Sequence, residues 1–162
     1  MNDERTTRLD RMRFTKNTLS SNLALLAIIF DVCFFISIYE SDVGSWYYTI
    51  LAGASILYNL ISMLAAFLSS EGVKNYKIGY SYLMIVLGII QIARIFIYPV
   101  QAHNAVVTIQ EQTVTVMETA QFTRVVLYLV LSAVCLFAGA VVGIIRSRAL
   151  AGHLATLESK AA

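Results

Sequence analysis

The stretch VVLYLVLSAVCLFAGAVVGII, residues 125–145, decides the fold class of this chain. It contains no charged residue, and a helix that rises ~1.5 Å per residue needs about 20 such residues to cross a hydrocarbon layer of ~30 Å. Strands of a membrane barrel would be only about 10 residues long and would alternate between apolar and polar residues. The unbroken run therefore predicts a transmembrane helix.

Three further apolar stretches precede this one, and each is long enough to form a similar helix. They cover about residues 20–39, 46–68 and 78–98. Hydrophobic residues make up 58% of the 162-residue chain and charged residues 14%, too few to cover the surface of a soluble domain. We therefore predict an all-α integral membrane protein: a four-transmembrane-helix bundle, in a single membrane domain that has the lipid bilayer as its partner.

Lysine and arginine residues gather at alternate ends of the four stretches, where they would share one side of the membrane. They are Arg5, Arg8, Arg11, Arg13, Lys16, Lys74, Lys77, Arg146, Arg148 and Lys160. Because positively charged flanks tend to stay in the cytoplasm, both termini are predicted to be cytoplasmic. A cleavable signal peptide is the weaker interpretation of the first stretch, since no small-x-small cleavage site follows it. We expect a multi-pass protein of the cell membrane, with the bacterial inner membrane as the natural location.

Two cytoplasmic segments flank the predicted helices. The basic N-terminal segment, residues 1–19, suits a short helix on the anionic inner leaflet and, about equally well, a solvated tail that sets topology. The C-terminal tail, residues 146–162, repeats leucines at helical spacing and is expected to prolong the last helix.

The outer loop, residues 99–124, is the longest connection. Pro99 should end the third helix, because proline lacks the N–H that a helix interior needs. The β-branched runs AVVTI and TVTVM make a short hairpin possible, but no glycine marks its turn. We favour an irregular or partly helical cap over the hairpin.

The chain lacks the residue patterns of most membrane enzymes. Both histidines, His103 and His153, lie outside the apolar stretches, so they cannot hold a haem between helices. No HExxH, GxSxG, P-loop or glycine-rich dinucleotide motif occurs, and no group of carboxylates has metal-binding spacing. The net charge of +2 is too small for a nucleic-acid partner. We expect a non-catalytic protein without a metal or cofactor, and a lipid-active enzyme is a distant third interpretation.

Two charged residues lie inside the predicted helices, Asp31 in the first and Arg94 in the third. A charge near the bilayer centre costs ~2.5 to 3.5 kcal/mol on insertion scales, so each needs a partner. Both lie roughly 22 to 26 Å along their helices from the basic flanks, at ~1.5 Å per residue. We predict that they meet as an intramembrane ion pair or polar site, to which Gln91 and Asn59 can add hydrogen bonds.

The fourth stretch carries a packing signal. Cys135, Gly139 and Gly143 recur every four residues, and GAVVG is a GxxxG motif. Small residues at this spacing let two helix backbones approach closely. The motif predicts a close helix crossing, either within the bundle or between subunits.

The charged pair favours a structural role, because an arginine cannot release its proton and would keep the aspartate ionised. We therefore expect a scaffold or accessory subunit of a membrane complex, or a homo-oligomer, with a membrane-protein partner or self-association. The alternative is a small oligomeric transporter or channel subunit that uses the intramembrane polar residues. Four helices with an acid in the first resemble the small multidrug-resistance transporters, which work as dimers around a membrane glutamate. This chain has an aspartate, a longer outer loop and Arg94 instead, and we do not assign it to that family.

Overall fold

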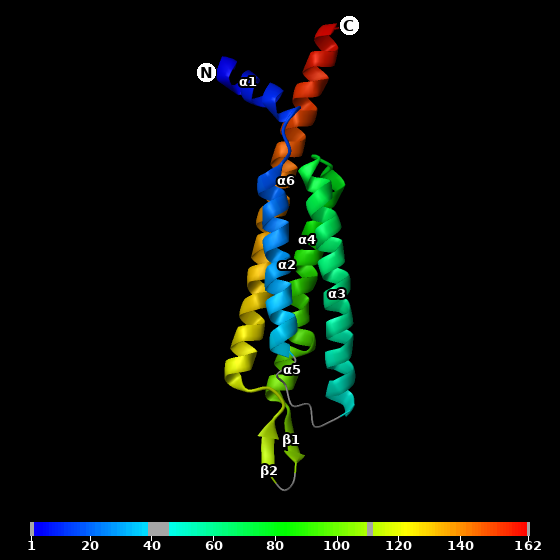
Figure 1. The fold of residues 1–162 in the computed structure, drawn as a ribbon, viewed down its shortest axis with the longest axis vertical. Helices are drawn as coiled ribbons and strands as arrows, with labels where there is room; N and C mark the ends of the chain where they lie inside the picture. The colour runs from blue at the N-terminus through cyan, green and yellow to red at the C-terminus, as the bar shows by residue number, and fades with distance from the viewer. Residues whose placement is uncertain (1, 39–45, 110–111, 162) are drawn as a thin grey trace.

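Four long helices dominate the computed structural model, which describes residues 2–38, 46–109 and 112–161 (Figure 1). They are α2 (Thr18–Ile38), α3 (Trp46–Lys74), α4 (Ile78–Ile97) and α6 (Thr119–Ala161). Within the described residues, all four are long and apolar enough to cross a membrane. Each predicted stretch falls on one of these helices, apart from residue 39, which lies outside the described residues, and Tyr98, which directly follows α4. The prediction of a helical chain with four possible membrane spans is confirmed.

The four helices form an elongated bundle in which consecutive helices run in opposite directions (Figure 1). Helix α6 packs against α2 and α4, and α3 packs against the same two helices from the other side. The two termini and the α3–α4 turn therefore lie towards one end of the bundle, and the outer loop lies at the other. The basic segments of the sequence are thus gathered at one end, as alternating helices require.

The turn between α3 and α4 is closed by backbone hydrogen bonds around Tyr76. Its φ of 57° is left-handed. The Lys77 N–H donates to the Gly72 carbonyl at 3.2 Å, and the Tyr76 N–H donates to the Val73 carbonyl at 3.1 Å. This is the Schellman pattern, which satisfies carbonyls that the end of α3 leaves without partners.

The outer loop combines a short helix and a hairpin. Helix α5 (Pro99–Asn104) begins with proline, whose missing N–H costs nothing at a first helical position. Strands β1 (Val106–Ile109) and β2 (Gln112–Thr115) then pair antiparallel. The predicted helical cap is therefore correct only for α5. The two strands form the hairpin, which was the less favoured alternative. The β-branched residues stabilise the pleated strands without a glycine turn.

The basic end extends beyond the bundle. Helix α6 continues without a break past Ile145, and α1 (Asn2–Met12) crosses it (Figure 1). His153 Nε2 on α6 lies 2.7 Å from Asp10 Oδ1 on α1, which ties the two helices together. Of the two interpretations of the N-terminal segment, the structure has the helix.

The core contains two apolar clusters, one towards each end of the bundle. Met84, Leu136 and Ala140 belong to the cluster nearer the termini, and Phe34 and Leu129 belong to the one nearer the outer loop. Between these clusters lie the buried polar residues Asp31 on α2, Gln91 and Arg94 on α4, and Ser132 on α6. A polar layer therefore divides the core.

Candidate functional site

The polar layer draws side chains from all four long helices. Helices α2 and α6 contribute one residue each, and α3 and α4 contribute two each. Every member has at most 5% of its surface exposed. The members are Asp31, Asn59, Ser62, Gln91, Arg94 and Ser132.

Gln91 lies at the centre of this layer. Its Nε2 donates to both carboxylate oxygens of Asp31, at 2.7 and 2.9 Å. Its Oε1 accepts a hydrogen bond from Nη1 of Arg94 at 2.6 Å. The hydroxyls of Ser62 and Ser132 lie 3.4 Å from Nε2, at the limit of hydrogen bonding. One amide therefore connects the acid on α2 to the base on α4.

The guanidinium of Arg94 is held by both polar and aromatic groups. Nη1 also donates to Asn59 Oδ1 at 2.9 Å, and Nη2 donates to the Ser55 carbonyl at 3.3 Å. The guanidinium carbon lies 4.5 Å from the centre of the Phe34 ring and 4.9 Å from that of Tyr58. A ring face attracts a cation through its quadrupole, so the two rings compensate part of the lost hydration.

Asn59 completes the connection between helices. Its Nδ2 donates to the main-chain carbonyl of Asp31 at 2.9 Å, while its Oδ1 accepts from Arg94. A single α3 side chain thus bonds to both α2 and α4. Such a network favours one register of the helices, because any slip would leave buried polar groups without partners.

The structure brings together Asp31, Asn59, Gln91 and Arg94, the polar residues singled out in the sequence. Of the two predicted alternatives, an ion pair or a polar site, it has the polar site. Within the described residues, no ion pair joins the carboxylate of Asp31 to the guanidinium of Arg94. Gln91 lies one helical turn before Arg94 and therefore occupies the space beside Asp31. The opposite charges balance each other through an amide rather than by contact.

Sequence reasoning missed Ser132 and the aromatic rings that contact Arg94. Ser132 had a usable signal, because it is the one serine in the otherwise apolar stretch 125–145. Ser62 lies three residues after Asn59, on the same face of α3. Phe34 and Tyr58 had no such signal, since aromatic residues are frequent in every apolar stretch of this chain.

The small residues of α6 face the interior of the bundle. Ser20 Oγ on α2 donates to the Gly139 carbonyl at 2.5 Å. A side chain at Gly143 would collide with Ser81 on α4 and would lie 3.1 Å from Ser20 Oγ. Cys135 is buried in the apolar cluster nearer the termini. Of the two predicted alternatives, the structure therefore has the crossing within the bundle.

A cavity of about 280 Å³ lies between α3 and α4, beside the polar layer. Apart from Arg94 and Ser55, its lining is aliphatic or aromatic. The lining residues are Leu51, Ala54, Ser55, Tyr58, Ile90, Arg94, Ile97 and Tyr98. Its chemistry suits an amphiphile with an anionic end near Arg94.

In the ranges 2–38, 46–109 and 112–161, no three histidine, cysteine, aspartate or glutamate side chains lie close enough to hold a metal ion. Comparison of the chain with family models, with curated proteins and with solved structures finds no match. The function is therefore argued from the contacts within this molecule.

Proposed function

We propose that this chain is a non-catalytic membrane protein that serves as a scaffold or accessory subunit of a membrane complex, or as a homo-oligomer. The observation that carries the proposal is that the side chains of the polar layer form hydrogen bonds with one another. Both carboxylate oxygens of Asp31 and both ends of the Gln91 and Asn59 amides bond to other members of the layer. Groups used in this way stabilise one arrangement of helices and leave little capacity for a solute.

Burial of the acid also supports an architectural role. A proton carrier needs an acid that exchanges its proton with water on alternate sides of the membrane. Asp31 is 1% exposed, its carboxylate accepts two hydrogen bonds from Gln91, and the same amide contacts Arg94. These contacts stabilise the ionised acid, which is the state that a carrier must be able to leave.

Surfaces for a partner exist both in the bilayer and outside it. Helix α3 packs mainly against α2 and α4 and leaves an apolar face that includes Leu57, Ile61 and Leu64, each about 60% exposed. At the basic end, α1 and the extension of α6 project beyond the bundle (Figure 1). Lipid or a partner helix would cover the first surface, and a cytoplasmic partner would meet the second.

A variant without the two charges tests this proposal. Asp31→Asn combined with Arg94→Gln removes both charges and keeps a polar side chain at each position. For a scaffold, the purified chain in proteoliposomes should carry no proton current above that of empty vesicles. The folded double variant should also recover the same membrane proteins as the native chain after purification in mild detergent. Proton flux by the native chain that the folded double variant loses would overturn the proposal.

The cavity beside Arg94 favours a second candidate, a small oligomeric transporter or channel subunit. An amphiphilic anion entering between α3 and α4 could reach the guanidinium. Ala54→Trp would fill the cavity, and Ala138→Trp adds the same bulk at an exposed position of α6. For the transporter, uptake of decanoate into proteoliposomes should be lost in Ala54→Trp and kept in Ala138→Trp. Equal uptake by both variants would reject this candidate.

A further inference from the structure

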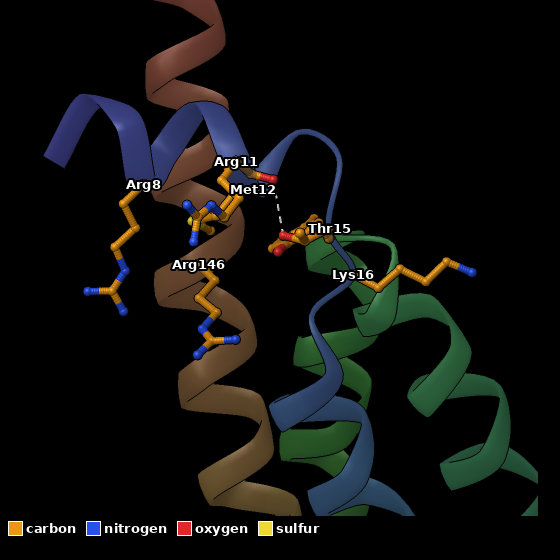
Figure 2. Close-up of a pocket in the computed structure, with 7 residues that line it drawn as sticks. Arg8, Arg11, Met12, Thr15, Lys16 and Arg146 are labelled. Carbon is orange, nitrogen blue, oxygen red and sulfur yellow. Dashed lines mark hydrogen bonds between the residues drawn. The ribbon is translucent and has the colours of Figure 1, made fainter. Parts of the chain in front are cut away.

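A second cavity lies at the basic end, where α1 crosses α6 (Figure 2). Its volume is about 230 Å³, and its lining contains four cationic side chains and no carboxylate. The lining residues are Arg8, Arg11, Met12, Thr15, Lys16, Tyr76 and Arg146. Like charges brought together from different parts of the chain repel each other, so an anion bound here would stabilise the arrangement.

Hydrogen bonds hold the Arg146 side chain and the turn after α1 in place, while the side chains of Arg8 and Arg11 are exposed. Arg146 Nη1 donates to Asn17 Oδ1 at 2.9 Å, and Asn17 is fully buried. Thr15 Oγ1 donates to the Arg11 carbonyl at 3.1 Å, which fixes the turn after α1. Figure 2 shows that Arg8 and Arg146 extend from different helices towards the bundle, whereas Lys16 extends away from them. The guanidinium groups of Arg8 and Arg146 are therefore directed towards the region where the membrane surface would lie.

The described acids around this cavity have other partners or lie at its edge. Asp10 is bonded to His153, and Glu71 pairs with Lys74 at 2.9 Å. Glu4 lines a neighbouring, larger and more open cavity of about 450 Å³ together with Arg8 and Arg11, and it does not line the basic cavity. The basic cavity itself therefore keeps an excess of positive charge.

An apolar cavity of about 280 Å³ adjoins the basic one and shares three residues with it, Arg8, Met12 and Arg146. The rest of its lining is apolar, namely Leu9, Ile145 and Ala149. Ile145 ends the apolar stretch of α6 and is 62% exposed, so it lies where the hydrocarbon layer would end. A molecule that filled both cavities would carry an anionic group joined to an apolar chain.

We propose that the two cavities bind one anionic phospholipid, with the phosphate among Arg8, Arg11 and Arg146 and the start of an acyl chain against Leu9 and Ile145. Guanidinium groups bind phosphate through paired N–H donors, which favours arginine over lysine in such sites. A free phosphate would use only the basic cavity. The adjoining apolar lining is what favours a lipid. This inference is independent of whether the protein is a scaffold or a transporter.

Native mass spectrometry of the full chain in non-ionic detergent tests the proposal, because it counts bound lipids. The probes are dioctanoyl phosphatidic acid, dioctanoyl phosphatidylcholine and inorganic phosphate. We expect one phosphatidic acid per chain, bound at least tenfold more tightly than the other two probes. Charge-assisted hydrogen bonds predict that Arg146→Gln weakens binding about tenfold or more, and that adding Arg8→Gln weakens it further.

Two control variants separate a site from general electrostatic attraction. Arg13→Gln removes the same charge from an exposed position outside both cavities and should weaken binding no more than about fivefold. Ala149→Trp fills the apolar cavity without changing charge and should weaken phosphatidic acid binding while thermal stability stays near that of the native chain. This variant also keeps the test valid if an arginine variant fails to fold.

Three outcomes would overturn the proposal. Equal losses in Arg13→Gln and Arg146→Gln would mean attraction by net charge alone. Equal binding of phosphatidylcholine would remove the role of the anionic group. The third outcome combines two results: inorganic phosphate displaces phosphatidic acid at equal concentration, and Ala149→Trp has no effect on binding. Together they would mean that the cavity binds a soluble phosphate and not a lipid.

Discussion

Moving the buried carboxylate from α2 to α4 tests whether the Gln91 amide connects the two charges. The double substitution Asp31→Asn and Gln91→Glu conserves shape and net charge. An asparagine amide at 31 could then donate to the new carboxylate at 91, which would accept directly from Arg94. The native order of acid, amide and base becomes amide, acid and base.

Each single substitution should be costly, for different reasons. Gln91→Glu alone replaces the donor of two hydrogen bonds, 2.7 and 2.9 Å long, with a second carboxylate. Each charge-assisted bond is worth about 1.5 to 3 kcal/mol in soluble proteins, so the loss of two bonds would cost about 3 to 6 kcal/mol. At the average of ~0.6 kcal/mol per hydrogen bond measured within membranes, the same loss would cost about 1 kcal/mol. Asp31→Asn alone leaves Arg94 without a counter-charge, which costs about 3 to 5 kcal/mol in soluble interiors.

The free energy of unfolding in bicelles should be measured for the native chain, both single variants and the double variant. We expect the double variant to recover at least about 2 kcal/mol of the summed losses, well beyond the ~0.5 kcal/mol scatter of independent sites. Gln101→Glu makes the same chemical change at an exposed position of α5 and should stay within about 0.5 kcal/mol of the native chain. Losses that add within ~0.5 kcal/mol would show that no amide connects the charges.

Three other predictions concern packing, the edge of the polar layer and topology. Gly143→Leu should destabilise the bundle by about 1 to 3 kcal/mol in an unfolding titration, because the leucine side chain would collide with α4. Gly53→Leu is the control and should not destabilise the bundle, because the space beside Gly53 is open. Ser132→Ala should cost about 0.6 to 1.7 kcal/mol by the same measurement, because its hydroxyl bonds to the Asp31 carboxylate and lies 3.4 Å from Gln91 Nε2. No measurable loss would mean that the hydroxyl adds nothing to the polar layer. A cysteine replacing Asn104 should react with an impermeant thiol reagent outside intact cells, and one replacing Asn75 should not; the reverse pattern would invert the membrane orientation.

Local patterns in the sequence were sufficient to predict the helices. Lipid offers no hydrogen bonds to a backbone, so an apolar run of about 20 residues must satisfy its own peptide groups as a helix. The same regularity placed Asp31 and Arg94 at similar heights, because the rise per residue is constant along a helix. Both conclusions depend only on the order of residues within one segment.

The outer loop shows where such patterns stop being decisive. Val106 and its neighbours fit a strand and a helix about equally well, and the pairing of β1 with β2 decides between them. The Val116 N–H then donates to the Ala105 carbonyl at 3.1 Å and closes the base of the hairpin. This bond joins residues that no helical spacing connects, so periodicity alone could not predict it.

The sequence by itself therefore determined which long segments are helical, that Asp31 and Arg94 lie inside them, and that these two residues lie at similar heights. Only the tertiary structure decided that Gln91 lies between Asp31 and Arg94, and that Arg8 and Arg146 border a common cavity. These contacts depend on how each helix is rotated about its axis and on which helices are neighbours. Rotation and neighbours follow from the packing of side chains across the whole bundle, and no single segment contains that information.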